Sequence, residues 1–132
     1  MIELTDVELF KDLTLIEQDG NTYDLHNDYD CIDLSYDKES ESINIVFEKH
    51  SSKSLGNDKI CLLFKNVTVA KFYLFFIRTE DTSTINSFYR GKFENDGELF
   101  ERSSGGAGYF YIEFEKGDKF EFFSKKVLLL EI

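Results

Sequence analysis

The chain has 132 residues, 42% of them hydrophobic, and a formal net charge of −11. Its fourteen Phe and seven Tyr residues supply enough apolar surface for a core, which excludes a disordered chain of this charge, and the length predicts a single domain over residues 1–132. The negative charge opposes broad contact with nucleic-acid phosphates and with anionic lipids, so we expect neither nucleic acid nor a membrane as a partner.

The first ten residues, MIELTDVELF, lack the basic start, the apolar run and the cleavage site of a secretion signal. The longest apolar runs, residues 72–77 and 127–130, have the length of strands and fall short of the roughly 18 residues that a membrane helix needs. Cys31 and Cys61 lie within predicted strands. We therefore expect a cytoplasmic protein with two free, buried thiols, a disulfide between neighbouring strands being the alternative.

Two patterns follow one another near the N-terminus. The sequence Thr5-Asp6-Val7-Glu8 has the residues of a capping box and predicts a short helical turn over Asp6–Lys11. After it, Leu13 and Leu15 alternate into Asp19-Gly20, and Tyr23 and Leu25 alternate out of it. This second pattern predicts a β-hairpin.

A period of two dominates the rest of the chain. Residues 31–36 and 43–47 alternate between apolar and polar side chains and are joined by the polar segment 37–41, which predicts a hairpin with one buried face. In its first strand Ile32, Leu34 and Tyr36 alternate with Cys31, Asp33 and Ser35. Asp33 therefore faces outward if Ile32 and Leu34 face the core.

The later segments complete an all-β pattern. Asp96-Gly97 predicts a tight hairpin between residues 86–94 and 98–102, because Gly tolerates a positive φ. Residues 72–77 are apolar on both faces, which predicts a strand that is central or covered on both sides. Further strands are expected at residues 60–64, 110–114, 120–122 and 127–131. About nine or ten short strands predict a two-layer antiparallel β-sandwich, jelly-roll-like or a flattened barrel.

No motif in the sequence fixes a reaction. There is no Gly-x-Ser-x-Gly sequence and no evident pairing of Cys with His, so we predict no catalytic residue and no cofactor. The glycine-rich segment 103–108 is followed by a strand rather than a helix. It therefore predicts a hairpin loop and not a phosphate-binding loop.

Three weaker patterns suggest ligands. Residues 24–30 place oxygen and nitrogen atoms at every second position, but not with the spacing of a known calcium loop, so we predict no metal site. Residues 87–93 mix aromatic rings with two cations, a pattern of single-strand nucleic-acid sites that the net charge disfavours. Tyr109 and Tyr111 share one face of their strand and are candidates for stacking on a sugar.

The negative charge is concentrated in the first third of the chain. Residues 1–41 hold thirteen acidic and two basic residues, whereas residues 42–132 hold thirteen of each. Because solubility needs only a modest, dispersed charge, this concentration indicates a docking surface for a basic partner, a solvated acidic face being the alternative. The predicted partner-binding residues, with the tyrosines as aromatic anchors, are Asp24, Asp28, Tyr29, Asp30, Asp33, Tyr36, Asp37, Glu39 and Glu41.

These features favour a non-catalytic, intracellular protein–protein interaction domain. Its most concrete form is an inhibitor or immunity-type protein whose carboxylates replace phosphates in the cleft of a basic partner such as a nuclease toxin. Two rival classes stay open, a ligand-binding β-sandwich for sugar or calcium and a subunit of a larger assembly. Self-association and strand order are left open by the sequence.

Overall fold

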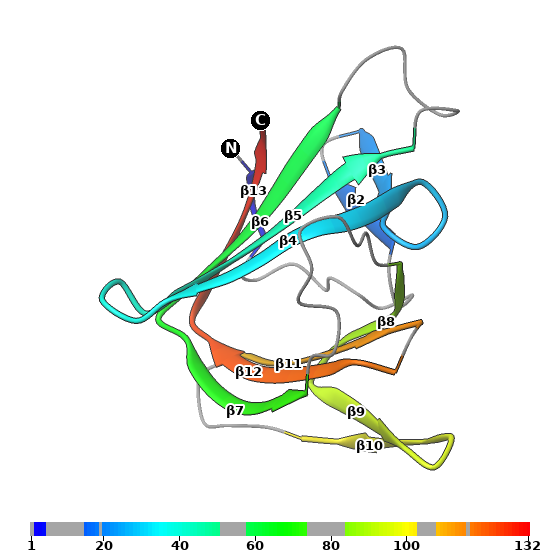
Figure 1. Ribbon diagram of the computed structural model, residues 1–132, viewed down its shortest axis with the longest axis vertical. Helices are drawn as coiled ribbons and strands as arrows, with labels where there is room; N and C mark the ends of the chain where they lie inside the picture. The colour runs from blue at the N-terminus through cyan, green and yellow to red at the C-terminus, as the bar shows by residue number, and fades with distance from the viewer. Residues whose placement is uncertain are drawn as a thin grey trace.

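The computed structural model describes residues 2–4, 15–18, 20–50, 58–73, 84–102, 108–115 and 117–132. All regular structure in these ranges is β-strand, so they contain no helix that could cross a membrane. Antiparallel sheets pack against one another, as Figure 1 shows, which confirms the predicted all-β sandwich-like fold. The predicted helical turn Asp6–Lys11 and residues 103–107 of the predicted loop lie outside the described ranges.

The first sheet has five strands in the order β1-β13-β6-β5-β4, with every neighbouring pair antiparallel. β4 and β5 form the hairpin predicted from residues 31–36 and 43–47, so that prediction is confirmed. β4 lies at one edge and, within the described part of the chain, pairs only with β5. The strands are β1 (Ile2–Glu3), β13 (Lys126–Glu131), β6 (Lys59–Lys65), β5 (Ser42–Lys49) and β4 (Tyr29–Asp37).

The second sheet has four strands in the order β7-β12-β11-β8, again antiparallel. β7 contains residues 72 and 73 of the strand expected to be central or covered on both sides, and within the described ranges it lies at the edge of this sheet; residues 74–77 lie outside those ranges. The strands are β7 (Thr68–Tyr73), β12 (Lys119–Ser124), β11 (Gly108–Phe114) and β8 (Ile85–Arg90).

Two hairpins complete the described fold. β2 (Leu15–Gln18) and β3 (Asn21–Asp24) confirm the hairpin predicted near the N-terminus. β9 (Lys92–Asn95) and β10 (Glu98–Glu101) confirm the one predicted around Asp96-Gly97, where both turn residues have positive φ. The single strand expected at residues 86–94 is divided, because Gly91 has a φ of 75° and turns β9 away from β8.

The two sheets meet at Phe64 of β6. Its ring stacks on Phe88 of β8 at 6.2 Å between centroids and meets Phe110 of β11 and Phe122 of β12 edge-on at 5.1 and 4.8 Å. All four side chains are buried within one hydrophobic core. A single ring of the first sheet therefore contacts three strands of the second, in the offset and edge-to-face geometries that aromatic pairs favour.

A β-bulge in β4 changes which of its side chains face the core from those that the sequence predicts. Cys31 pairs with Phe47 and Asp33 pairs with Val46, so Ile32 is the extra residue. Cys31, not Ile32, joins the buried core, while Asp33 points outward as expected. Because a bulge shifts the alternation by one residue, the pattern of apolar residues alone placed Ile32 on the wrong face.

Both cysteines are free and buried, which confirms the predicted thiols. Burial raises the pKa of the Cys31 thiol to about 12. The thiol therefore remains protonated at neutral pH and acts as a packing group.

We predict that Phe64→Ala lowers the free energy of unfolding by about 3–5 kcal/mol, because it leaves a cavity where the two sheets meet. Urea denaturation followed by circular dichroism measures this. Leu99→Ala is the control, since Leu99 is 52% exposed, and it should change stability by less than about 0.5 kcal/mol. Equal effects of the two substitutions would contradict the central place of Phe64.

Candidate functional site

The nine predicted partner-binding residues follow β4 from one end to the other and do not form one patch. Asp24 ends β3, Asp28 lies in the next turn, and Glu39 and Glu41 lie in the turn between β4 and β5. A nine-residue strand spans roughly 30 Å, whereas charges in physiological salt are screened within about 8 Å. The charges before β4 and those in the turn after it are therefore separate, and Asp33 lies between them in the middle of the strand.

The carboxylates near the start of β4 contact other residues of the fold. Asp24 accepts hydrogen bonds from the Asn27 backbone N–H and Nδ2 at 3.0 and 2.9 Å; burial opposes the effect, but these bonds lower the pKa of Asp24. Asp30 lies 3.1 Å from His50 Nδ1 and accepts a hydrogen bond from the Thr84 hydroxyl. These carboxylates organise the turn and join β4 to its neighbours.

Tyr29 is not an exposed anchor. It is 5% exposed, because it lies two residues before Cys31 and shares the core-facing side of β4. Asp28 beside it is half-buried, and its carbonyl accepts the His50 backbone N–H at 2.9 Å. The structure therefore does not place this pair on an open surface.

The group at the end of β4 is open to solvent. Asp33, Asp37, Glu39 and Glu41 are all exposed, and Tyr36 among them is 44% exposed. Figure 1 shows this turn at the far left, projecting beyond the two sheets. We call these five residues, Asp33, Tyr36, Asp37, Glu39 and Glu41, the acidic hairpin.

Hydrogen bonds hold the acidic hairpin in shape. Asp37 accepts the Ser40 hydroxyl at 2.8 Å and the Glu39 backbone N–H at 3.0 Å, and these bonds hold the pKa of Asp37 below its usual value. Glu41 has a φ of 50°, and its carbonyl accepts the Val67 N–H at 2.8 Å, which ties the turn to the residues between β6 and β7. The carboxylates of Asp37, Glu39 and Glu41 are thus presented by an ordered turn, whereas Asp33 lies in the middle of β4.

A second feature lies on the outer face of the four-stranded sheet. Tyr109 and Tyr111 share that face, as predicted, but they are 1% and 2% exposed because the β9–β10 hairpin covers them. Tyr89 stacks on Tyr111, and Phe93 and Phe123 pack against the cluster. Neither tyrosine ring is open as a platform for a sugar, contrary to expectation.

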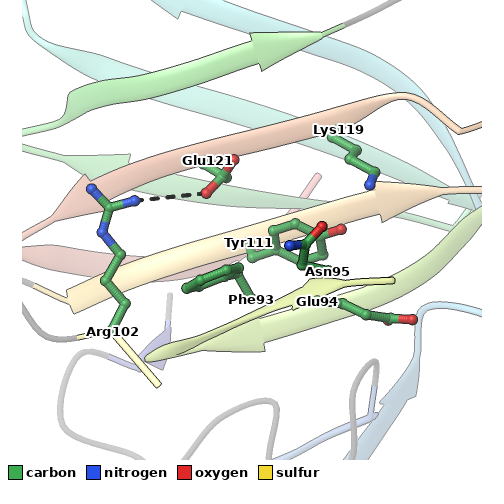
Figure 2. Close-up of a pocket in the computed structure, with 7 residues that line it drawn as sticks. All are labelled: Phe93, Glu94, Asn95, Arg102, Tyr111, Lys119 and Glu121. Carbon is green, nitrogen blue, oxygen red and sulfur yellow. Dashed lines mark ion pairs between the residues drawn. The ribbon is translucent and has the colours of Figure 1, made fainter. Parts of the chain in front are cut away.

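A cavity of about 350 Å³ lies between this face and β9. Figure 2 shows Arg102 and Lys119 at opposite ends of it, with Phe93 and Tyr111 between them. Glu121 accepts a hydrogen bond from the Tyr109 hydroxyl and lies 3.8 Å from Arg102. The residues that line the cavity are Phe93, Glu94, Asn95, Arg102, Tyr111, Lys119 and Glu121.

The sequence did not predict this cavity, although it singled out Tyr111 and the segment 87–93, which ends at the lining residue Phe93. The available signal was the outward face of residues 119–123, which mixes a cation, a carboxylate and an aromatic ring. What the sequence did not show is that Gly91 turns the β9–β10 hairpin back over that face. Gly91 N–H donates to the Tyr109 carbonyl at 2.7 Å, and its own carbonyl accepts the Arg102 N–H at 2.9 Å, which fixes both ends of the hairpin.

Another cavity, of about 450 Å³, lies beside β3, where β4 and β6 begin and β5 and β13 end. The Tyr23 hydroxyl donates to Glu131 Oε1 at 2.7 Å on its wall. Burial, together with the nearby Glu131 carboxylate, raises the pKa of Tyr23 to about 12. This bond joins the β2–β3 hairpin to β13 of the five-stranded sheet.

Nothing in the described ranges forms a metal centre, since they bring together no group of three His, Cys, Asp or Glu side chains that could hold an ion. The residues between 24 and 30 that suggested calcium are engaged in the turn contacts given above. His26 and His50 contact the Ile85 carbonyl and Asp30 respectively, on different elements.

No protein-family model matches the chain, and searches of curated proteins and of solved structures found no significant similarity. A function must therefore be argued from the geometry and charge of this chain alone.

We predict that Tyr109→Phe lowers the free energy of unfolding by about 1.5–3 kcal/mol, because it removes the hydroxyl that donates to the buried Glu121 carboxylate. Guanidinium denaturation measures the change. Tyr36→Phe deletes an exposed hydroxyl and should change stability by less than about 0.5 kcal/mol. An equally small effect at Tyr109 would show that the bond to Glu121 does not stabilise the fold.

The raised pKa of Tyr23 predicts a loss of stability in alkali. A tyrosine whose pKa is higher in the folded than in the unfolded state stabilises the fold below pH 10, and this contribution disappears between pH 10 and about 12. Unfolding midpoints measured from pH 9 to 12 should fall less steeply for Tyr23→Phe than for the unaltered protein. Parallel curves would contradict the assignment.

Proposed function

We propose that this protein is a non-catalytic interaction domain whose acidic hairpin binds a basic protein partner inside the cell. The observation that carries the proposal is the exposure of four carboxylates and of Tyr36 along the second half of β4 and the turn that follows it. Residues 28–41 contain six acidic residues and a single basic one, Lys38, so little positive charge lies along this edge to offset them.

The arrangement suits association with a basic surface. Concentrated charge of one sign speeds encounter with a partner of opposite sign, and tyrosine is among the residues that most often dominate binding energy at interfaces. A projecting hairpin can enter a concave partner, where its carboxylates would replace phosphate groups. A nuclease cleft is such a surface, and an inhibitor or immunity-type protein would block it.

Protection of the sheet edge is the competing explanation. Charged side chains on an edge strand discourage pairing with the edge of another molecule. β4 is an edge strand within the described part of the chain, so its charges could serve this purpose without any partner. The two explanations differ in their consequence for binding, which the following experiment measures.

We predict that the quadruple variant D33N/D37N/E39Q/E41Q weakens binding to a basic partner about tenfold or more. The partner would be captured from cell extract at about 50 mM salt, released at about 300 mM, and its affinity then measured by calorimetry. Asn and Gln keep the size of the side chains, and in D37N the carbonyl oxygen can still accept from the Glu39 N–H while the amide nitrogen can donate to the Ser40 hydroxyl. The expected loss therefore comes from charge.

The matched control is E17Q/E98Q/E101Q/E115Q, which removes four exposed carboxylates from other strands and turns. Both variants change the net charge from −11 to −7, so a general charge effect would weaken both equally. The proposal requires that only the hairpin variant lose affinity and salt dependence. An affinity that neither set of substitutions alters would refute it.

A further inference from the structure

The cavity under β9 has the features of a built site for a small molecule. Its floor is the outer face of the four-stranded sheet, from which Tyr111, Lys119 and Glu121 project, and its wall is β9 with Phe93, Glu94 and Asn95. Figure 2 shows that these side chains come from two layers of the fold. A volume of about 350 Å³ lies within the range usual for small-molecule sites.

Glu121 is fixed before any ligand arrives. It is 9% exposed, and both of its described polar contacts, from the Tyr109 hydroxyl and from Arg102, use Oε1. Arg102 is itself held over the rings of Tyr109 and Phe123, at 5.0 and 5.2 Å from the centroids. The other carboxylate oxygen, Oε2, receives no hydrogen bond from the described residues and remains as an acceptor for a ligand.

The remaining polar groups have no ion pair within the described ranges. Lys119 and Glu94 both line the cavity, and neither forms a salt bridge with a described residue. Asn95 adds an amide that can both donate and accept. With Arg102 and Glu121, the lining therefore contains two cations and two anions.

This balance of charge selects the class of ligand. An anion would be repelled by Glu94 and Glu121, and a cation would be repelled by Arg102 and Lys119. The attraction of a charged ligand to two of these groups is therefore offset by its repulsion from the other two. A hydroxyl group can donate to carboxylates and accept from ammonium, guanidinium or amide groups. Phe93, which is half-buried between the polar groups, offers apolar contact to carbon atoms.

We propose that this cavity binds a neutral saccharide of one or two rings, with Glu121, Glu94, Lys119 and Asn95 contacting its hydroxyl groups. The proposal does not depend on the acidic hairpin, since the two features share no residue. It also differs from a platform formed by Tyr109 and Tyr111, because both rings are buried. The hairpin contributes three of the seven lining residues, so the site exists only where β9 crosses the sheet.

The test is an NMR titration of the ¹⁵N-labelled full chain. Glucose, galactose, mannose, lactose, maltose and cellobiose are added separately up to about 50 mM, a range that detects millimolar affinity. At least one should shift the amide signals of residues 93–95 and 119–121 in a saturable way. In the variant Glu94→Gln with Lys119→Gln, which leaves the net charge unchanged, that affinity should fall about tenfold.

The control is Lys92→Gln with Glu98→Gln, which removes one cation and one anion from exposed positions of the same hairpin outside the cavity. It should bind within about twofold of the unaltered protein, a difference well below one hydrogen bond to a charged group. The proposal is overturned if no sugar gives saturable shifts in the cavity, or if both variants lose affinity equally. Preferential binding of the zwitterion L-alanine, added as a further probe, would also overturn it.

Discussion

Contact between Phe64 and three rings of the opposite sheet is the constraint on which the rest of the structure depends. Phe88, Phe110 and Phe122 come from three strands of the four-stranded sheet, so one side chain of β6 sets the spacing of both layers. In the described ranges the core cluster between the sheets consists of apolar side chains, and close-packed interiors of this kind leave little room for polar chemistry. Recognition must therefore take place on outer faces, edges and turns.

The outer face of the four-stranded sheet shows how the fold accommodates charge beside aromatic rings. Burying Glu121 alone would cost several kcal/mol, because a desolvated carboxylate needs compensating partners. The Tyr109 hydroxyl and Arg102 supply those partners, and the rings beneath Arg102 hold the guanidinium in place. The β9–β10 hairpin thus does more than cover apolar surface, since it closes a network that is both polar and rigid.

The alternation of apolar and polar side chains along the chain was sufficient to predict the all-β class and most hairpins, because it depends on local residues. It failed where one residue changes the geometry without changing the pattern. Ile32 forms a bulge and so exchanges faces with Cys31, and Gly91 divides a strand that reads as continuous. The burial of Tyr29 follows from that same bulge. The cavity could not be predicted, because it joins segments whose contact depends on the path of the chain after Gly91.

The position of the acidic residues separates the two explanations of the charge. Edge protection requires charges beside unpaired backbone groups, and Asp33 on β4 satisfies that requirement. Glu39 and Glu41, however, lie in the turn beyond the strand, where no run of backbone groups is open to another edge. Local structure accounts for Asp24 and Asp30, which accept hydrogen bonds from neighbouring side chains, but it does not account for these two glutamates. Their exposed charge is therefore the observation that favours the proposed docking on a basic surface over protection of the sheet edge.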